Sequence, residues 1–135
     1  MKRYFLALSL IAVMASCDIT IIEPRYDYRD QMVGYYDLEE YSETFNDYTY
    51  YSVRISKDGN SGRRVYFDNF YGANIRVYAN VDYTKITIPY QVVNGYEIEG
   101  VGNLQGNHVS LTYRVKDLYQ HSVSDFCDSW GERDW

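Results

Sequence analysis

Hydrophobic and polar residues alternate along most of the chain after residue 32, and short turns interrupt the alternation. A period of two places alternate side chains on one face of a β-strand. Asn94-Gly95 separates two such runs and favours a tight hairpin, because both central residues of a type I′ turn need positive φ. We expect three consecutive strands here, with one face formed by Ile86, Ile88, Tyr90, Val92, Tyr96, Ile98, Gly100, Gly102, Leu104, Val109, Leu111, Tyr113 and Val115.

The same alternation predicts further strands on both sides of this meander. Their ranges are 33–43, 48–57, 63–70, 75–82 and 123–130. Eight short strands without a helical period indicate an all-β domain, either an antiparallel up-and-down barrel or a two-layer β-sandwich. Pro89 interrupts one run, and since proline cannot donate to a ladder, it predicts an edge strand or a bulge.

An eight-stranded barrel has an interior that side chains fill or that holds one small ligand. The residues expected to point inward are mostly bulky and favour a filled core: Val53, Ile55, Ile75, Val77, Val81, Ile86, Ile88, Ile98, Leu111 and Tyr113. Three small inward positions, Ala79, Gly100 and Gly102, leave a second interpretation open. They either leave space for a pocket or allow strong bending of the sheet.

The first 16 residues have the composition of an export signal. Lys2 and Arg3 precede an apolar run over 5–14, and the small residues Ala15 and Ser16 follow. This order is typical of a secretory signal peptide. Since a membrane-spanning helix needs about 20 apolar residues, we expect residues 1–16 to be cleaved during export rather than to span a membrane.

Residues 14–17, MASC, resemble the lipobox of bacterial lipoproteins. The resemblance implies cleavage before Cys17, lipidation of its sulfur, and fatty-acyl chains such as palmitate that anchor the protein to a membrane of the cell envelope. The alternative is an ordinary signal peptide that leaves Cys17 as a thiol. Asp18 marks inner-membrane retention in some bacteria, but acidic residues also serve surface export, and we expect the outer membrane rather than the inner.

Residues 17–31 are expected to join this anchor to a folded β domain over 32–135. The segment is largely polar, contains Pro24 and has no sustained period. Fourteen extended residues after Cys17 span about 46 Å at roughly 3.3 Å each. The alternative is that residues 19–22 pair as a short edge strand.

The charge and the cysteine content restrict the classes of partner that the chain is expected to bind. Removal of residues 1–16 leaves 11 basic residues against 19 acidic ones, a formal net charge of −8. Nucleic acid is therefore not expected as a partner, and the acyl anchor is the expected membrane contact. With Cys17 acylated, Cys127 has no intramolecular partner and is expected to be a small buried hydrophobe.

Gly34-Tyr35-Tyr36 resembles the Gly-x-Trp start of lipocalins and related calycin barrels, with Tyr36 in the position of the tryptophan. The segments ITIPYQ, GYEIEGVGN and GNHVSLTYRV also resemble the lipocalin-like domains of small bacterial lipoproteins. The resemblance implies an eight-stranded lipocalin-like barrel that binds a small apolar molecule. It transfers no catalytic residue.

Tyrosines are the candidate ligand-binding residues, because the chain has 17 of them and their amphipathic rings suit sugar or protein recognition. Cross-strand tyrosine pairs also stabilise sheets without a ligand. Both interpretations apply to the candidates Tyr66, Tyr78, Tyr90 and Tyr113, and to an outward patch of Tyr66 and Tyr78 with Tyr35 and Tyr41.

Catalytic groups are not evident. Glu97 and Glu99 lie two residues apart on one strand face, about 6 to 7 Å apart by strand rise. This separation overlaps that of glycosidase carboxylates, although neighbours on any solvated face have it too. The glycines of GVGNLQG, residues 100–106, precede a strand rather than a helix and are expected to be hairpin glycines. Cys127 has no flanking basic residue.

Metal ligands are not evident either, and no cofactor is expected. His108 and His121 lack zinc-site spacing. Four acidic residues near the C-terminus lack the pattern of a calcium loop. We expect them to form a solvated acidic segment: Asp125, Asp128, Glu132 and Asp134.

Together these patterns predict a membrane-anchored envelope lipoprotein that is not an enzyme. Its β domain is expected to bind a small apolar ligand, a glycan or an envelope protein. The alternative is a structural accessory subunit of an envelope assembly without a small-molecule ligand. An enzyme would require Glu97 or Glu99 to be buried beside a partner carboxylate.

Overall fold

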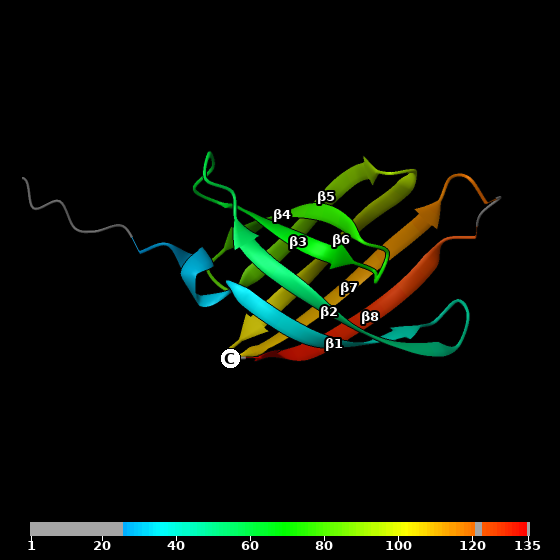
Figure 1. Ribbon diagram of the computed structural model, residues 1–135, viewed down its shortest axis with the longest axis horizontal. Helices are drawn as coiled ribbons and strands as arrows, with labels where there is room; N and C mark the ends of the chain where they lie inside the picture. Colours follow the sequence, from blue (N-terminus) through cyan, green and yellow to red (C-terminus); the bar gives the residue numbers. More distant parts are fainter. Residues whose placement is uncertain (1–25, 121–122, 135) are drawn as a thin grey trace, which may run out of the picture.

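The computed structural model describes residues 26–120 and 123–134, which form a closed, eight-stranded antiparallel barrel (Figure 1). The predicted up-and-down barrel is confirmed, and the sandwich alternative is wrong. Cys17, the signal peptide, most of the proposed tether and His121 lie outside the described residues. The elements are the 3₁₀-helix η1 (Tyr28–Gln31), β1 (Gly34–Ser42), β2 (Asp47–Lys57), β3 (Arg64–Phe70), β4 (Ile75–Asp82), β5 (Lys85–Val93), β6 (Tyr96–Gln105), β7 (His108–Asp117) and β8 (Asp125–Asp134).

Tight turns connect the strands where local sequence permits positive φ. Asn94 and Gly95, with φ of 48° and 80°, connect β5 to β6, as a type I′ hairpin requires. The predicted Asn94-Gly95 turn is therefore confirmed. Consecutive strands pair along the barrel, and β8 pairs with β1 to close it.

Strand β5 contains a bulge that reverses part of the predicted face. Its register against β6 shifts between Ile88 and Gln91, around Pro89. The prediction that Tyr90 and Val92 share a face with Ile88 is wrong, because the bulge turns both outward, where they are more than half exposed. Gln91 points inward instead, and its amide bonds the main-chain N–H and C=O of Tyr78.

Strand β8 is longer than predicted and closes the barrel. It runs from Asp125 to Asp134 and pairs with β1 over eight residue pairs. A Cβ at Gly131 would lie 1.9 Å from the carbonyl oxygen of Asp37, so only glycine fits this contact. The four acidic residues predicted to form a solvated segment belong to β8; Glu132 and Asp134 are exposed as predicted, but the prediction is wrong for Asp125, which is buried.

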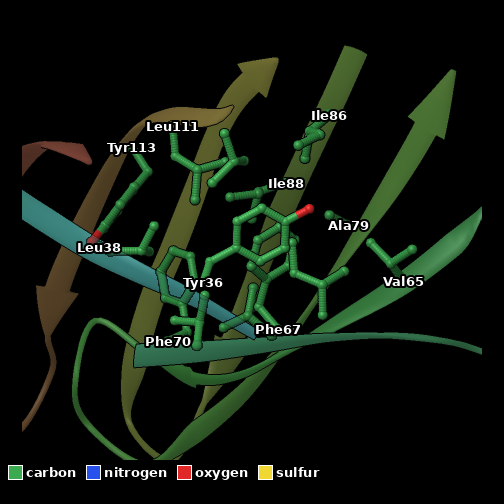
Figure 2. Close-up of a cluster of buried hydrophobic side chains, with 14 of the residues drawn as sticks. Tyr36, Leu38, Val65, Phe67, Phe70, Ala79, Ile86, Ile88, Leu111 and Tyr113 are labelled. Carbon is green, nitrogen blue, oxygen red and sulfur yellow. The ribbon is translucent and has the colours of Figure 1, made fainter. Parts of the chain in front are cut away.

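Apolar side chains fill much of the barrel interior. Tyr36 is fully buried among them, and the Phe67 and Phe70 rings meet edge to face at 6.2 Å (Figure 2). A Cβ at Gly100 or Gly102 would clash with strand β7 (His108–Asp117) and its side chains, so these glycines create no pocket. The ten bulky residues predicted to fill the core are all buried: Val53, Ile55, Ile75, Val77, Val81, Ile86, Ile88, Ile98, Leu111 and Tyr113.

One end of the barrel is sealed by the segment that precedes β1, and we call it the closed end. Met32 is fully buried there. Arg29 is 9% exposed and donates to the main-chain carbonyls of Asp58, Ser61 and Arg64. The last residues of the predicted tether therefore belong to the folded domain. The opposite end, formed by the β1–β2, β3–β4, β5–β6 and β7–β8 connections, is called the mouth (Figure 1).

Candidate functional site

Two adjoining cavities open at the mouth, with volumes of about 360 Å³ and 280 Å³. Phe45, Tyr71 and Asp125 line both of them. The larger cavity is also bordered by Tyr96, Val115, Asp117, Gln120 and Val123, and the smaller by Glu40, Ser42, Asp47 and Thr49. We call the pair the mouth cavities.

Strand alternation brings polar side chains to the inner face beside these cavities. In β1 the inward residues change from Tyr36 and Leu38 to Glu40 and Ser42 as the strand approaches the mouth. In β8 the inward Asp125 is followed by Cys127 and Ser129, which are also buried. The apolar core therefore gives way to a polar layer at the mouth.

Glu40 is the centre of one hydrogen-bond network in this layer. Its Oε1 accepts from the Tyr51 hydroxyl at 2.8 Å and from Ser129 Oγ at 3.0 Å. The Tyr51 and Tyr113 hydroxyls lie 3.0 Å apart. Because the single Tyr51 proton goes to Glu40, Tyr113 is the donor in that second bond. The Glu40 side chain is held in place by hydroxyl groups.

Asp125 is the centre of a second network at the same end. Its Oδ1 accepts from the Ser42 hydroxyl and its Oδ2 from the Tyr71 hydroxyl. The Phe45 main-chain N–H donates to Ser42 Oγ at 3.0 Å, which connects the β1–β2 loop to this network. Asp125 thus joins the last strand to two loops of the mouth.

Burial shifts the pKa of two groups in the polar layer, Glu40 and Cys127. Burial raises the pKa of Glu40, and the hydrogen bonds from Tyr51 and Ser129 oppose this by lowering it. The nearby Asp125 carboxylate raises the Glu40 pKa further. Burial likewise raises the pKa of the Cys127 thiol far above its usual range, with contributions from the same two carboxylates. Cys127 is therefore suited to packing rather than to nucleophilic attack.

Basic partners are absent from this network in the part of the chain that the structure describes. None of the ion pairs among residues 26–120 and 123–134 involves Glu40 or Asp125. Elsewhere in the same barrel, Arg76 pairs with Asp68 at 2.6 Å and Arg114 with Glu99 at 2.9 Å. Glu40 and Asp125 are thus buried carboxylates that accept hydrogen bonds from hydroxyl groups and form no ion pair among these residues.

Tyr66 and Tyr78 lie directly opposite each other on β3 and β4, on the outer face. Arg76 covers the Tyr66 ring at 4.8 Å, and Arg64 covers the Tyr78 ring at 4.3 Å. The protein's own guanidinium groups thus occupy the ring faces that a sugar would need. The arrangement favours the interpretation of this pair as a stabilising cross-strand contact.

The other predicted tyrosines lie in different parts of the barrel. Tyr90 is exposed and donates to Glu97 at 2.6 Å, far from the interior. Tyr113 is buried and belongs to the network around Glu40. Tyr35 is exposed beneath Arg54, and Tyr41 packs against Tyr48 at 4.9 Å. Of the four candidate ligand residues, only Tyr113 reaches the polar layer of the mouth.

The candidate catalytic and metal groups do not converge. Glu97 is engaged by Tyr90 and Glu99 by Arg114, both on the outer face. Among the described residues, no three histidine, cysteine or acidic side chains are placed to hold a metal ion. Within the same residues, no helix has the length and apolar character needed to cross a bilayer.

A larger hollow of about 590 Å³ lies on the outer face over β1, β2 and β8. Tyr50 and Trp130 border it on either side of Glu39, to which Tyr50 donates at 3.2 Å. The hollow is an open furrow between side chains of the sheet surface. The mouth cavities are the stronger site, because they have buried, fixed polar groups at their base.

Sequence reasoning missed Glu40 and assigned Asp125 to solvent. The available signal was the alternation of β1, in which Tyr36, Leu38, Glu40 and Ser42 share one face. Continuing the inward period to the end of the strand would have placed a carboxylate inside the barrel. The partner network of Glu40 comes from β2, β7 and β8, and no local pattern predicts it.

Comparison with known proteins supports the fold alone. No family model matches the chain, and no curated protein matches it. Among solved structures, a redesigned β-barrel is similar to this chain with a TM-score of 0.58 and 7% sequence identity. The similarity covers 84% of this chain and 100% of the redesigned barrel. It places the chain in the class of small closed β-barrels.

Proposed function

We propose that this protein is a lipid-anchored, non-catalytic binding module of the bacterial cell envelope that takes a small molecule at the mouth of its barrel. The observation that carries the binding role is the polar layer beneath the mouth cavities. A barrel that served only as a scaffold would gain from an apolar filling at this level, since buried polar groups contribute little net stability. Here Glu40 and Asp125 instead border open space.

The size of the cavities supports a compact ligand. Ligand pockets usually have volumes of about 300 to 1,000 Å³, and the mouth cavities of about 360 Å³ and 280 Å³ lie at the lower limit. The apolar core below them is filled and blocks a long acyl chain. The resemblance implies a small apolar ligand, and the cavities restrict this proposal to a compact molecule whose polar groups point toward Glu40 and Asp125.

The anchor rests on the MASC sequence and fits the geometry of the barrel. The described chain enters the barrel at the closed end, through η1, and the mouth is at the opposite end (Figure 1). A lipid on Cys17 would tether the protein from the side of the closed end. The mouth would then face away from the membrane and remain open to solutes.

The alternative is a structural accessory subunit of an envelope assembly without a small-molecule ligand. In that case an outer surface, such as the furrow beside Tyr50 and Trp130, would be buried against a protein partner. The two functions differ in what accompanies the protein when it is extracted from its own envelope.

Native mass spectrometry of the full chain extracted from its own envelope in mild detergent tests both functions. The proposed function predicts a small adduct that is lost on denaturation. The adduct should be absent from Val123→Trp, which fills a cavity at an exposed position of its wall, and present in the control Thr87→Trp on the outer face. Bare protein, or a stoichiometric protein companion alone, would contradict ligand binding.

The anchor is tested separately by labelling cells with a palmitate analogue. The wild-type chain should incorporate the label and fractionate with membranes. Cys17→Ala should lose both properties, whereas Cys127→Ala should retain them. Label on the Cys17→Ala protein, or none on the wild type, would contradict the lipoprotein assignment.

A further inference from the structure

We propose that the mouth cavities select a small organic cation, such as a protonated amine on a compact apolar body, through Glu40, Asp125 and the aromatic walls above them. The inference rests on the proposed function, because it names the ligand class for the same site. It is carried by the charge, burial and aromatic composition of that site.

Every charged side chain that lines the mouth cavities in the described part of the chain is acidic. Glu40 and Asp125 lie at the base, and Asp47 and Asp117 lie on the walls. Carboxylates of one sign around a low-dielectric opening concentrate cations and repel anions. The cavities thus favour a positively charged occupant over a carboxylate or phosphate.

Among residues 26–120 and 123–134, no cationic side chain pairs with the two basal carboxylates, although both are buried. Glu40 is 3% exposed and Asp125 is 5% exposed. Buried charges are normally paired, as the buried Arg29 is with Asp27 at 2.8 Å at the other end of the barrel. An ammonium group would bring the missing charge together with three hydrogen-bond donors.

Aromatic rings form the walls through which such a ligand would enter. Tyr71 lies with its ring centroid 6.3 Å from that of Tyr96 and 6.4 Å from that of Tyr113. Phe45 and Tyr71 border both cavities. Cations are attracted to aromatic faces within about 6 Å of the centroid, and the Phe45, Val115 and Val123 side chains offer an apolar surface to the rest of the ligand.

A metal ion fits this site less well than an organic cation. Metal ions require three or more converging protein ligands in most stable sites, and no such group exists among the described residues. The hydroxyls of Ser42, Tyr51 and Tyr71 already occupy carboxylate lone pairs. The space above them suits a group that is larger and less demanding in geometry.

A matched series of three probes tests the inference on the full chain in detergent by isothermal titration calorimetry. The probes are 2-phenylethylammonium, neutral 2-phenylethanol and anionic 3-phenylpropionate, which share one apolar body. We expect the ammonium to bind at least about tenfold more tightly than the alcohol, and the anion not to bind. Equal affinity for ammonium and alcohol would overturn the charge selection while leaving the cavity as a ligand site.

Substitutions of Glu40 and Asp125 test whether these two carboxylates cause the preference for the ammonium probe. Glu40→Gln and Asp125→Asn should each reduce ammonium affinity about tenfold or more and leave alcohol affinity within about twofold. The control Asp37→Asn removes a carboxylate from the outer face and should change neither. Unchanged ammonium binding in both basal variants would overturn the assignment.

A thermal-shift measurement keeps the test decisive if a variant folds poorly. The ammonium should raise the melting temperature of the wild type and of Asp37→Asn, and should raise that of Glu40→Gln much less. Absence of a shift and of heat with all three probes on the folded wild type would overturn the cation inference. Detection of a native adduct of neutral or anionic chemistry would then preserve the proposed function without it.

Discussion

Arg29 is predicted to hold the closed end of the barrel together, although it lies in a segment that the sequence indicates to be a tether. Its Nη1 donates to the carbonyls of Asp58, Ser61 and Arg64 at 2.9, 2.5 and 3.0 Å. Its Nε and Nη2 pair with the two carboxylate oxygens of Asp27. The perturbation is Arg29→Met, which keeps the apolar stem and removes every side-chain donor, while the main-chain N–H of residue 29 can still donate to Asp27.

The expected loss of unfolding free energy in Arg29→Met follows from these contacts. A hydrogen bond from a charged donor contributes about 1.5 to 3 kcal/mol net, and three of them would give at most roughly 4.5 to 9 kcal/mol if they were additive. Water can reach the carbonyls of the surface loop in the variant, which reduces the loss. Removing one partner of a buried ion pair costs about 3 to 5 kcal/mol, and we expect a loss of about 3 kcal/mol for Arg29→Met.

The assay is equilibrium unfolding in urea, followed by circular dichroism, on the soluble chain with the first 16 residues removed and Cys17→Ser. A loss of about 3 kcal/mol corresponds to a decrease in melting temperature on the order of 10 °C for a domain of this size. Arg29→Lys should lose about half as much, because one ammonium cannot reproduce the planar fork. The control Arg63→Met removes an exposed neighbour and should stay within about 0.5 kcal/mol of the wild type. A loss below 1 kcal/mol for Arg29→Met would refute the role of this segment in the fold.

Three further predictions address closure, thiol chemistry and acid stability. Gly131→Ala should lower the unfolding free energy by more than about 3 kcal/mol, because its Cβ would lie 1.9 Å from the carbonyl oxygen of Asp37; urea unfolding at near wild-type stability would show that β1 and β8 separate easily. Cys127 should react with a maleimide only after unfolding, since it is buried with a raised pKa; rapid labelling of the folded chain would contradict the packing around it. Hydrogen bonding to Arg29 lowers the pKa of Asp27 from 3.8 to about 2. A carboxyl group whose pKa is lower in the folded than in the unfolded state stabilises the fold at pH values above its unfolded-state pKa. The difference in unfolding free energy between wild type and Asp27→Asn should therefore narrow as pH falls from 3.8 through about 2. A constant difference between their acid unfolding curves would exclude this linkage.

The local pattern of the sequence predicts the strands well and their faces only as far as the pairing stays regular. The strand over 75–82 is observed with those bounds, because its alternation is uninterrupted. In β5 the alternation continues to Val92, but the bulge beside Pro89 turns Tyr90 and Val92 outward. Pro89 indicated an irregularity, and the direction of the neighbouring side chains depended on pairing with β6.

The candidate site is less visible in the sequence than the fold. Tyr66 and Tyr78 were correctly predicted on the outer face, but Arg64 and Arg76 cover their rings. Glu40 belongs to no recognisable sequence motif. Its hydrogen-bond partners Tyr51 and Ser129 lie 11 and 89 residues away in the sequence, on β2 and β8. Contacts over such separations leave no local pattern from which the site could be inferred.

By itself, the sequence determined the number of strands, the Asn94-Gly95 turn and the inward apolar residues outside the β5 bulge, since each depends on residues within one hairpin. It also contains residues 1–17, whose resemblance to an export signal and a lipobox is a short linear pattern and remains a prediction. Only the tertiary structure decided that β8 closes on β1, that Arg29 seals one end, and that Glu40 and Asp125 border the same cavity at the other. Each of those features brings together residues that are far apart in the sequence. Once these residues lie inside the barrel, away from water, their polar groups must find hydrogen-bond or charge partners there.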